Sequence, residues 1–215
     1  MDENLIEAQY NVTRKSRLLR FYESNKLIIF ATIAGIVIAT AFFSFYLNNK
    51  KHEKISLAEK YIQAKIYIEK KNNDEAKKIL EKIILSNDST YSTLSLFLIL
   101  NENLIEDKKE ISLFFDHILK NNNYNIEIKN LIIFKRALFE SNFINELELL
   151  DLLRPLTNKE SIWKPHALLF LGDYFSSKRE YVKAREFYNQ VLLINNLNRE
   201  LYDQAKYQLT LIAND

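Results

Sequence analysis

Residues 165–198 read PHALLFLGDYFSSKREYVKAREFYNQVLLINNLN, and the spacing of the apolar residues in this stretch decides the fold. Large apolar side chains recur at the three- and four-residue intervals that place them on one face of an α-helix. Pro165 stands where a helix can begin without losing a backbone hydrogen bond. The same helical spacing continues through most of the chain, so we expect an all-α fold built from amphipathic helices.

The stretch also resembles the tetratricopeptide repeat, a 34-residue helical hairpin. In that repeat, a small residue at the eighth position and an alanine at the twentieth let the paired helices pack closely. Gly172 and Ala184 occupy these two positions here. A second frame of 34 residues, starting at Leu57, places Ala64 and Ala76 at the same two positions. We therefore predict that these four small residues pack one helix against the next within each repeat.

Further repeat units are predicted in the sequence between these two frames. A frame starting at Tyr91 is degenerate. Helices are predicted around residues 126–140 and 143–153, and the register then breaks. The extra residues of this break include Pro155, Asn158 and Trp163, which predict a longer loop. The last amphipathic segment, 198–212, is predicted to be a capping helix over the final apolar face.

The composition agrees with helices joined by short polar turns. The chain has only two glycines and two prolines, whereas sheet-rich folds use many turn glycines. Asparagine-rich breaks take the place of glycine, because asparagine tolerates left-handed backbone and caps helices. Asn73 or Asp74, for example, is placed to cap a helix. There are no cysteines, which excludes disulfides and thiolate chemistry.

One segment, Leu27 to Leu47, is uncharged over 21 residues. About 20 helical residues cross a hydrocarbon core of about 30 Å, so the segment predicts a transmembrane helix. A cleaved signal peptide would have a shorter apolar region and small residues before the cleavage point, and this segment ends in aromatic residues instead. A core helix is the other alternative, but a helix that is apolar all round needs more enclosure than the remaining chain supplies.

The charges around the segment predict its orientation. A short basic tail precedes it, and long domains cross largely regardless of charge. We therefore expect an N-terminal cytoplasmic tail (1–26), the membrane helix (27–47), a juxtamembrane linker (48–56) and a repeat domain (57–215) on the other side of the membrane. Ala31, Gly35 and Ala39 share one face of the membrane helix. They predict a helix-packing surface, unless they only reflect how common such residues are in membrane helices.

The repeat domain carries no recognisable chemistry. The chain from residue 51 onward has 24 basic and 24 acidic residues, so this part of it lacks the basic footprint of a nucleic-acid-binding protein. Its histidines have no second metal ligand at a suitable spacing, and acidic pairs such as Asp74-Glu75 fall at predicted helix starts. We expect no catalytic residues, metal, cofactor or small-molecule substrate. The first helices of the repeats line the concave face of such a domain, and candidate partner-binding residues there are Tyr61, Lys65, Ser95, Ile99, Leu169 and Asp173. The alternative for each of them is an ordinary solvated or half-buried helix residue.

Four segments share features with a known family: Arg20–Lys26 before the membrane segment, Ala58–Leu85, Leu171–Tyr174 and Lys183–Tyr188. Together they resemble the ancillary SecYEG translocon subunit family (YfgM-like). The resemblance implies a bacterial inner-membrane protein whose repeat domain is periplasmic and has a non-enzymatic role beside the secretion channel. Such a protein holds or passes on secreted chains together with periplasmic chaperones. The alternative is a membrane-tethered scaffold for another envelope-assembly or cell-division complex, and an enzyme is the third possibility.

Overall fold

The computed structural model describes the backbone of residues 3–213 and the side chains of residues 21–28 and 30–213. This part of the chain is helical and contains no strand. The basic side chains of the tail up to Arg20 lie outside the described residues. The helices are α1 (Glu3–Glu69), α2 (Asn73–Ile84), α3 (Tyr91–Asn101), α4 (Lys108–Asn121), α5 (Ile126–Glu140), α6 (Glu146–Thr157), α7 (Lys164–Ser177), α8 (Tyr181–Leu192) and α9 (Arg199–Ile212).

The chain divides into two compact units, residues 1–56 and 57–215. The first unit consists of the larger part of α1, and it contains a segment that is long and apolar enough to cross a membrane. None of this apolar segment is buried in the protein, so it is not a core helix. The residues predicted as a linker, 48–56, are helical and continue α1.

Two hydroxyl groups within the apolar segment are satisfied by the helix itself. Thr32 Oγ1 donates to the carbonyl of Ile28 at 2.8 Å, and Thr40 Oγ1 donates to the carbonyl of Val37 at 2.9 Å. An unpaired hydroxyl is costly in hydrocarbon. These local bonds therefore make both threonines compatible with a lipid environment.

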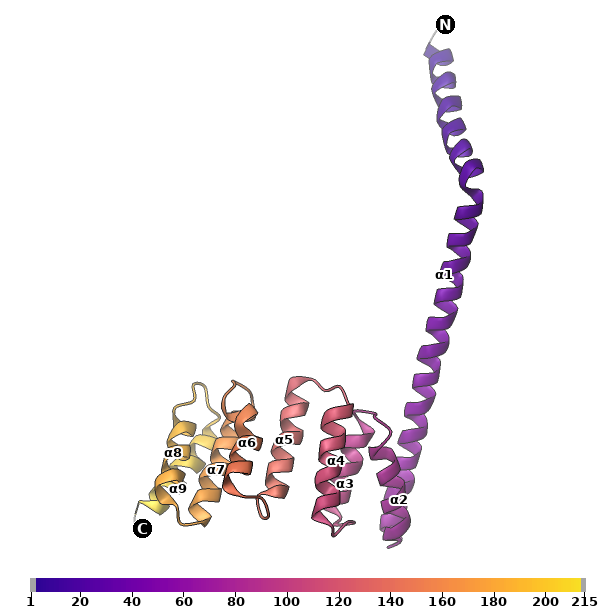
Figure 1. Cartoon of the computed structure of the whole chain (residues 1–215). Coiled ribbons are helices and arrows are strands. Elements are labelled where there is room, and N and C mark those ends of the chain that lie inside the picture. The colour runs from indigo at the N-terminus through magenta and orange to yellow at the C-terminus, as the bar shows by residue number, and fades with distance from the viewer. Residues whose placement is uncertain (1–2, 214–215) are drawn as a thin grey trace. The chain divides into compact units, whose positions relative to one another are not determined.

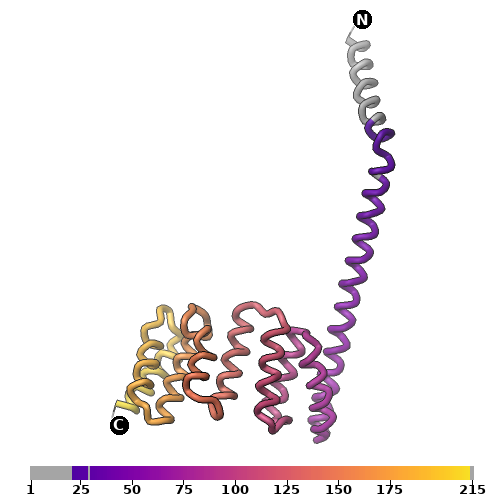
Figure 2. The backbone as a smooth tube through the Cα atoms, in the orientation of Figure 1, coloured from indigo at the N-terminus to yellow at the C-terminus, as the bar shows by residue number. Residues whose placement is uncertain are grey.

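The second unit begins at Leu57 and holds two hydrophobic cores. The first core joins the end of α1 to α2, α3, α4 and the middle of α5 around Leu80, Leu96 and Phe115. The second core is formed by the five helices from α5 through α9 and is centred on Phe175 and Tyr188. In Figure 1, α2 to α9 follow one another in chain order, and Figure 2 shows the backbone running up and down between successive turns.

Alternate helices of the second unit are also in contact. Lys77 on α2 pairs with Glu110 on α4 at 3.4 Å, and Lys183 on α8 pairs with Glu146 on α6 at 2.7 Å. On the other side, α7 packs against α9 as well as against α8. Even-numbered helices therefore neighbour even-numbered ones at these points, and α7 neighbours α9.

Asparagine side chains cap the N-termini of four helices. Side chains of Asn72, Asn125, Asn145 and Asn198 cap α2, α5, α6 and α9 by accepting backbone N–H bonds. The cap of α2 is thus Asn72 rather than the predicted Asn73 or Asp74. Five described residues other than glycine have left-handed backbone: Lys71, Asn87, Asn103, Arg179 and Asn196. Three of these five are asparagines. The predicted use of asparagine in place of glycine is confirmed at these three turns.

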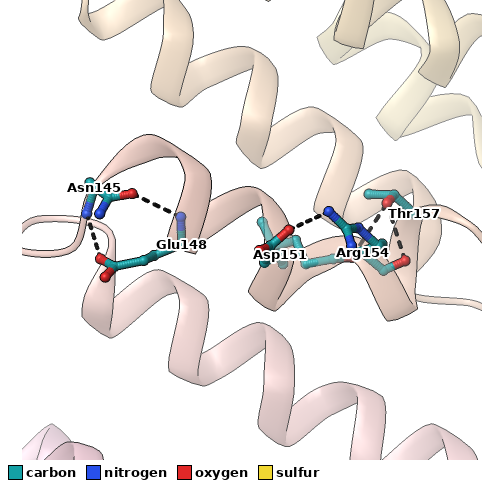
Figure 3. A network of polar contacts seen from close by, with 6 residues as sticks. Asn145, Glu148, Asp151, Arg154 and Thr157 are labelled. Atoms are coloured by element: carbon teal, nitrogen blue, oxygen red, sulfur yellow. Dashed lines mark hydrogen bonds and ion pairs between the residues drawn. The ribbon is translucent and has the colours of Figure 1, made fainter.

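Helix α6 differs most from its predicted bounds of 143–153. It starts at Glu146 because Asn145 and Glu148 form a capping box: each side chain accepts the other's backbone N–H, at 2.9 and 3.0 Å (Figure 3). The helix continues through Pro155, which was predicted to lie in a loop. A proline so near the end removes one backbone bond, and burial of Leu153 and Leu156 beside it outweighs that loss. The loop is shorter than expected, residues 158–163.

The capping box provides a direct test of this helix start. Substituting Asn145→Ala removes the acceptor for the Glu148 N–H, and loss of such a cap costs about 1 kcal/mol. We expect the free energy of unfolding to fall by this amount in urea titrations of the detergent-solubilised chain followed by circular dichroism. Asn142→Ala is the matched control, because Asn142 is exposed and caps no helix. An equal loss in both variants would contradict the capping role.

Candidate functional site

The four small residues of the predicted repeat packing are all buried. Ala64, Ala76 and Ala184 have no exposed surface, and Gly172 is buried as well. A Cβ atom added at Gly172 would lie 2.4 Å from Cε1 of Tyr188 on the neighbouring helix α8. Ordinary carbon contacts need about 3.5–4.0 Å. Gly172 therefore permits a close approach of α7 and α8 that no larger residue allows.

Four of the residues predicted to line the concave surface lie at or near the first hydrophobic core, and they differ in exposure. Tyr61 is half-buried, with its ring 6.1 Å from that of Tyr91, and Lys65 is exposed. Ser95 and Ile99, however, have no exposed surface, so the prediction that they contact a partner is wrong. Helix α3 mixes its few polar residues among apolar ones, and its sequence alone does not reveal which face is open.

The remaining two, Leu169 and Asp173, lie in the wall of a groove in the second unit. The groove has a volume of about 920 Å³. Its walls come from α5, α7 and α9 and from the loops that precede α7 and α9. Leu169 is almost fully buried at 6% exposure, so it forms part of the apolar wall rather than a free contact. We consider this groove the candidate functional site.

Aromatic side chains form one part of the groove wall. The ring of Phe134 on α5 packs edge-on against Phe170 on α7 at 6.1 Å, and it lies 6.3 Å from the ring of His166. The centre of the Trp163 ring lies 5.8 Å from that of the Phe134 ring and 5.6 Å from that of the His166 ring. These contacts between α5 and α7 fix the orientation of the rings, so the aromatic wall is formed before any ligand binds.

Carboxylates supply the charge of the groove. Its described lining includes four acidic residues and no lysine or arginine; the acidic residues are Glu127, Glu160, Asp173 and Glu200. Glu160 pairs with Lys164 at 2.6 Å. Glu127 Oε2 is buried without a hydrogen-bond partner among the described residues. The groove therefore carries negative charge that the protein neutralises only in part.

Asp173 is held from behind by Tyr188. The Tyr188 hydroxyl donates to Asp173 Oδ1 at 2.7 Å. Burial raises the pKa of the Asp173 carboxyl above its ordinary value, and the bond from Tyr188 opposes that rise. Burial and the neighbouring carboxylate together raise the pKa of the Tyr188 phenol. The pair links the groove wall to the tight contact at Gly172, because both involve the same tyrosine.

Two of the residues that line the groove, Leu169 and Asp173, were predicted from the sequence as binding residues, and the others were not. Leu169 and Asp173 are four residues apart on α7, and His166 and Phe170 form a parallel pair beside them. This spacing was the available signal for a shared face. Phe134, Glu127 and Glu200 come from helices more than twenty residues away, and their approach depends on how the helices stack.

The predicted membrane-helix face is present as a geometrical feature. Ala31, Gly35 and Ala39 are exposed along α1, and nothing lies within 4 Å of a Cβ atom built at Gly35. The structure contains the chain by itself, so the predicted packing of a second helix on this face stays a prediction.

The chain matches no protein-family model, no curated protein and no solved structure. The resemblance to the translocon subunit family therefore stays a prediction.

Proposed function

We propose that this chain is a membrane-anchored protein-binding subunit, and that the groove between α5, α7 and α9 is its binding site. The supporting observation is that one open groove joins an aromatic wall, apolar side chains and unpaired carboxylates from three helices. Apolar surface with a polar rim is the usual anatomy of a protein-recognition site. Because the groove is built on helices, its shape is present before a partner arrives.

Binding accounts for the groove better than catalysis does. Ser161 is the hydroxyl residue among the described lining residues, and His166 and the carboxylates also line the groove. Within the described residues, no hydrogen bond joins the Ser161 hydroxyl to His166 or to one of these carboxylates. Ser161 Oγ instead accepts the backbone N–H of Trp163 at 3.2 Å. An activated serine needs a base within hydrogen-bonding reach, so we assign the chain a non-enzymatic role.

The repeat arrangement supports the same proposal. The groove is lined by α5, α7 and α9, while ion pairs join α2 to α4 and α6 to α8. We propose that residues 57–212 form a short tetratricopeptide-like solenoid with α9 as its cap. Its first helices form one layer and its second helices the other. Solenoids of this kind present their binding surface on the layer of first helices.

The narrower proposal comes from the family resemblance. We propose that the apolar helix anchors the chain in a bacterial inner membrane with the helical domain in the periplasm. There the domain would hold or pass on secreted chains beside the SecYEG translocon together with periplasmic chaperones. A scaffold for another envelope-assembly or cell-division complex has the same anchor and the same groove, and it is the alternative.

Site-specific photocrosslinking in living cells tests these proposals. One crosslinker replaces Ile162, an exposed residue of the groove, and a second replaces Gly35 in the apolar helix. Val182 on α8 is the control, since it is 70% exposed and lies outside the groove. We expect protein adducts at Ile162 that are absent at Val182. Adducts to channel subunits and nascent chains support the translocon role, and one unrelated partner supports the scaffold. The same adducts at Ile162 and Val182, or no adducts at Ile162, would contradict the proposal that the groove is the binding site.

A further inference from the structure

We infer that the groove binds a cationic peptide segment of another protein, one that combines lysine or arginine with large apolar side chains. This inference rests on the proposed function and specifies the chemistry of the partner. Its basis is the asymmetry of the groove, whose described lining has four carboxylates and no lysine or arginine. Residues 57–215 as a whole hold 22 basic and 23 acidic residues, so the acidity is local to this surface.

Three of the four carboxylates lie at or just before helix starts, and the fourth, Asp173, lies further along α7, where Tyr188 donates to it. Glu127 and Glu200 are the second residues of α5 and α9, and Glu160 lies in the loop before α7. The loops that lead into α5, α7 and α9 emerge at the same end of the unit (Figure 1). Glu160 already has Lys164 as its partner. Glu127 and Glu200 have no ion-pair partner within the described part of the chain, so they are the carboxylates open to a ligand cation.

The helix starts do not neutralise these two side chains. A helix N-terminus carries about half a positive charge, whereas each carboxylate carries a full negative one. The balance at α5 and α9 is therefore negative. One oxygen of Glu127 is also buried without a donor, and a buried unpaired oxygen gains from any N–H that reaches it. A lysine or arginine side chain supplies both the charge and the N–H donors.

The rest of the lining selects for apolar and planar groups. The rings of Phe134 and Phe170 are held edge-to-face at 6.1 Å, which leaves aromatic surface for an incoming aliphatic or aromatic side chain. Aromatic faces also attract cations within about 6 Å of the ring centre. A purely polar cation would leave the aromatic wall of the groove exposed to water. A purely apolar segment would bury the carboxylates of Glu127 and Glu200 without ion-pair partners. A segment with both kinds of side chain satisfies both parts.

The dimensions fit a short peptide. The α5 residues of the lining run from Glu127 to Leu138, which is about 16 Å of helix at 1.5 Å per residue. An extended chain covers this length in about five residues at 3.3 Å each. A peptide of eight or nine residues therefore fills the groove with its ends free.

Fluorescence anisotropy with defined peptides tests the inference. The probe is a labelled nine-residue peptide of lysine, leucine and phenylalanine. Two comparison peptides have every lysine replaced by glutamate, or every leucine and phenylalanine replaced by serine. The full-length chain is held in phosphatidylcholine nanodiscs, and empty nanodiscs give the background. We expect the lysine peptide to bind the chain, and both comparison peptides to bind at least about tenfold more weakly, because charge and apolar contact each contribute.

Matched variants locate the binding. The double variant Glu127→Gln with Glu200→Gln removes the charges but keeps the side-chain shape. Its affinity for the lysine peptide should fall about tenfold at low salt, and by less at about 300 mM salt, where screening weakens the charges in the unsubstituted chain. The control is Glu102→Gln with Glu186→Gln, which removes two exposed carboxylates outside the groove and should leave the affinity unchanged.

Three results would overturn the inference. The first is an equal affinity of the groove variant and the control variant, and the second is equal binding of the lysine and glutamate peptides. The third is loss of peptide binding as the chain is concentrated, which would identify a second copy as the occupant. Adducts at Ile162 that persist alongside any of these results would leave the proposed binding function standing and reject only the cationic partner.

Discussion

We expect the substitution Gly172→Ala to lower the free energy of unfolding of the helical domain by about 2 kcal/mol. On helix propensity alone, alanine would stabilise α7 by about 1 kcal/mol. The added Cβ atom, however, would lie 2.4 to 2.9 Å from three ring carbons of Tyr188. Forcing one extra carbon into a packed core costs up to about 3 kcal/mol, or more when the neighbours cannot move. The steric cost therefore exceeds the gain in propensity.

Tyr188 cannot move aside cheaply. Its side chain has no exposed surface, and its hydroxyl is held by Asp173 at 2.7 Å. A shift of the ring would break this bond and would also disturb the groove wall that contains Asp173. For this reason we expect Gly172→Ala to weaken peptide binding in the groove as well as stability.

A double-mutant cycle identifies the ring as the cause. In a Tyr188→Leu background the ring carbons are gone, so Gly172→Ala should no longer lower the free energy of unfolding. Urea unfolding is followed by the fluorescence of Trp163, the single tryptophan of the chain, which packs against the core that contains Tyr188. Gly35→Ala is the control, because nothing lies within 4 Å of a Cβ at that position. A loss of the same size in both backgrounds would rule out the contact with Tyr188.

The helices that were predicted well are those whose ends carry their own signals. Helix α5 has the predicted bounds, 126–140, because Asn125 caps its start, and α9 begins one residue after its predicted start at Asn198. For α6, the apolar residues Phe143 and Ile144 extended the helical pattern toward the N-terminus. The capping box at Asn145 overrides that pattern in the structure.

The groove was harder to predict because its residues share no local pattern. Two of its residues, Leu169 and Asp173, were named from their position in the repeat, and Ser95 and Ile99 were named by the same reasoning. The first two line the groove and the other two are buried. The repeat position gives the layer in which a helix lies. Exposure also depends on the size of the neighbouring side chains, which a single repeat frame does not contain.

We expect the paired substitution Ile33→Lys with Val37→Lys to release the chain from the membrane. The two side chains are one helical turn apart near the middle of the apolar segment, and both are exposed, at 53% and 59%. A lysine near the centre of a membrane helix costs about 2.5–3.5 kcal/mol, so two cost about 5–7 kcal/mol. Because both lie too far from the ends of the segment to reach the interface easily, snorkelling recovers little of this cost.

Alkaline extraction of membranes measures the effect. The unsubstituted chain should remain in the membrane pellet, and the lysine pair should appear in the supernatant or be degraded. The control adds the same two charges outside the segment, through Ile62→Lys with Leu113→Lys, at positions that are 57% and 66% exposed. The control chain should stay in the pellet. The intact mass of the extracted chain separates the anchor from a cleaved signal peptide, because only an uncleaved chain retains residues 1–47. Full retention of the lysine pair would show that the apolar segment is not what holds this chain at the membrane.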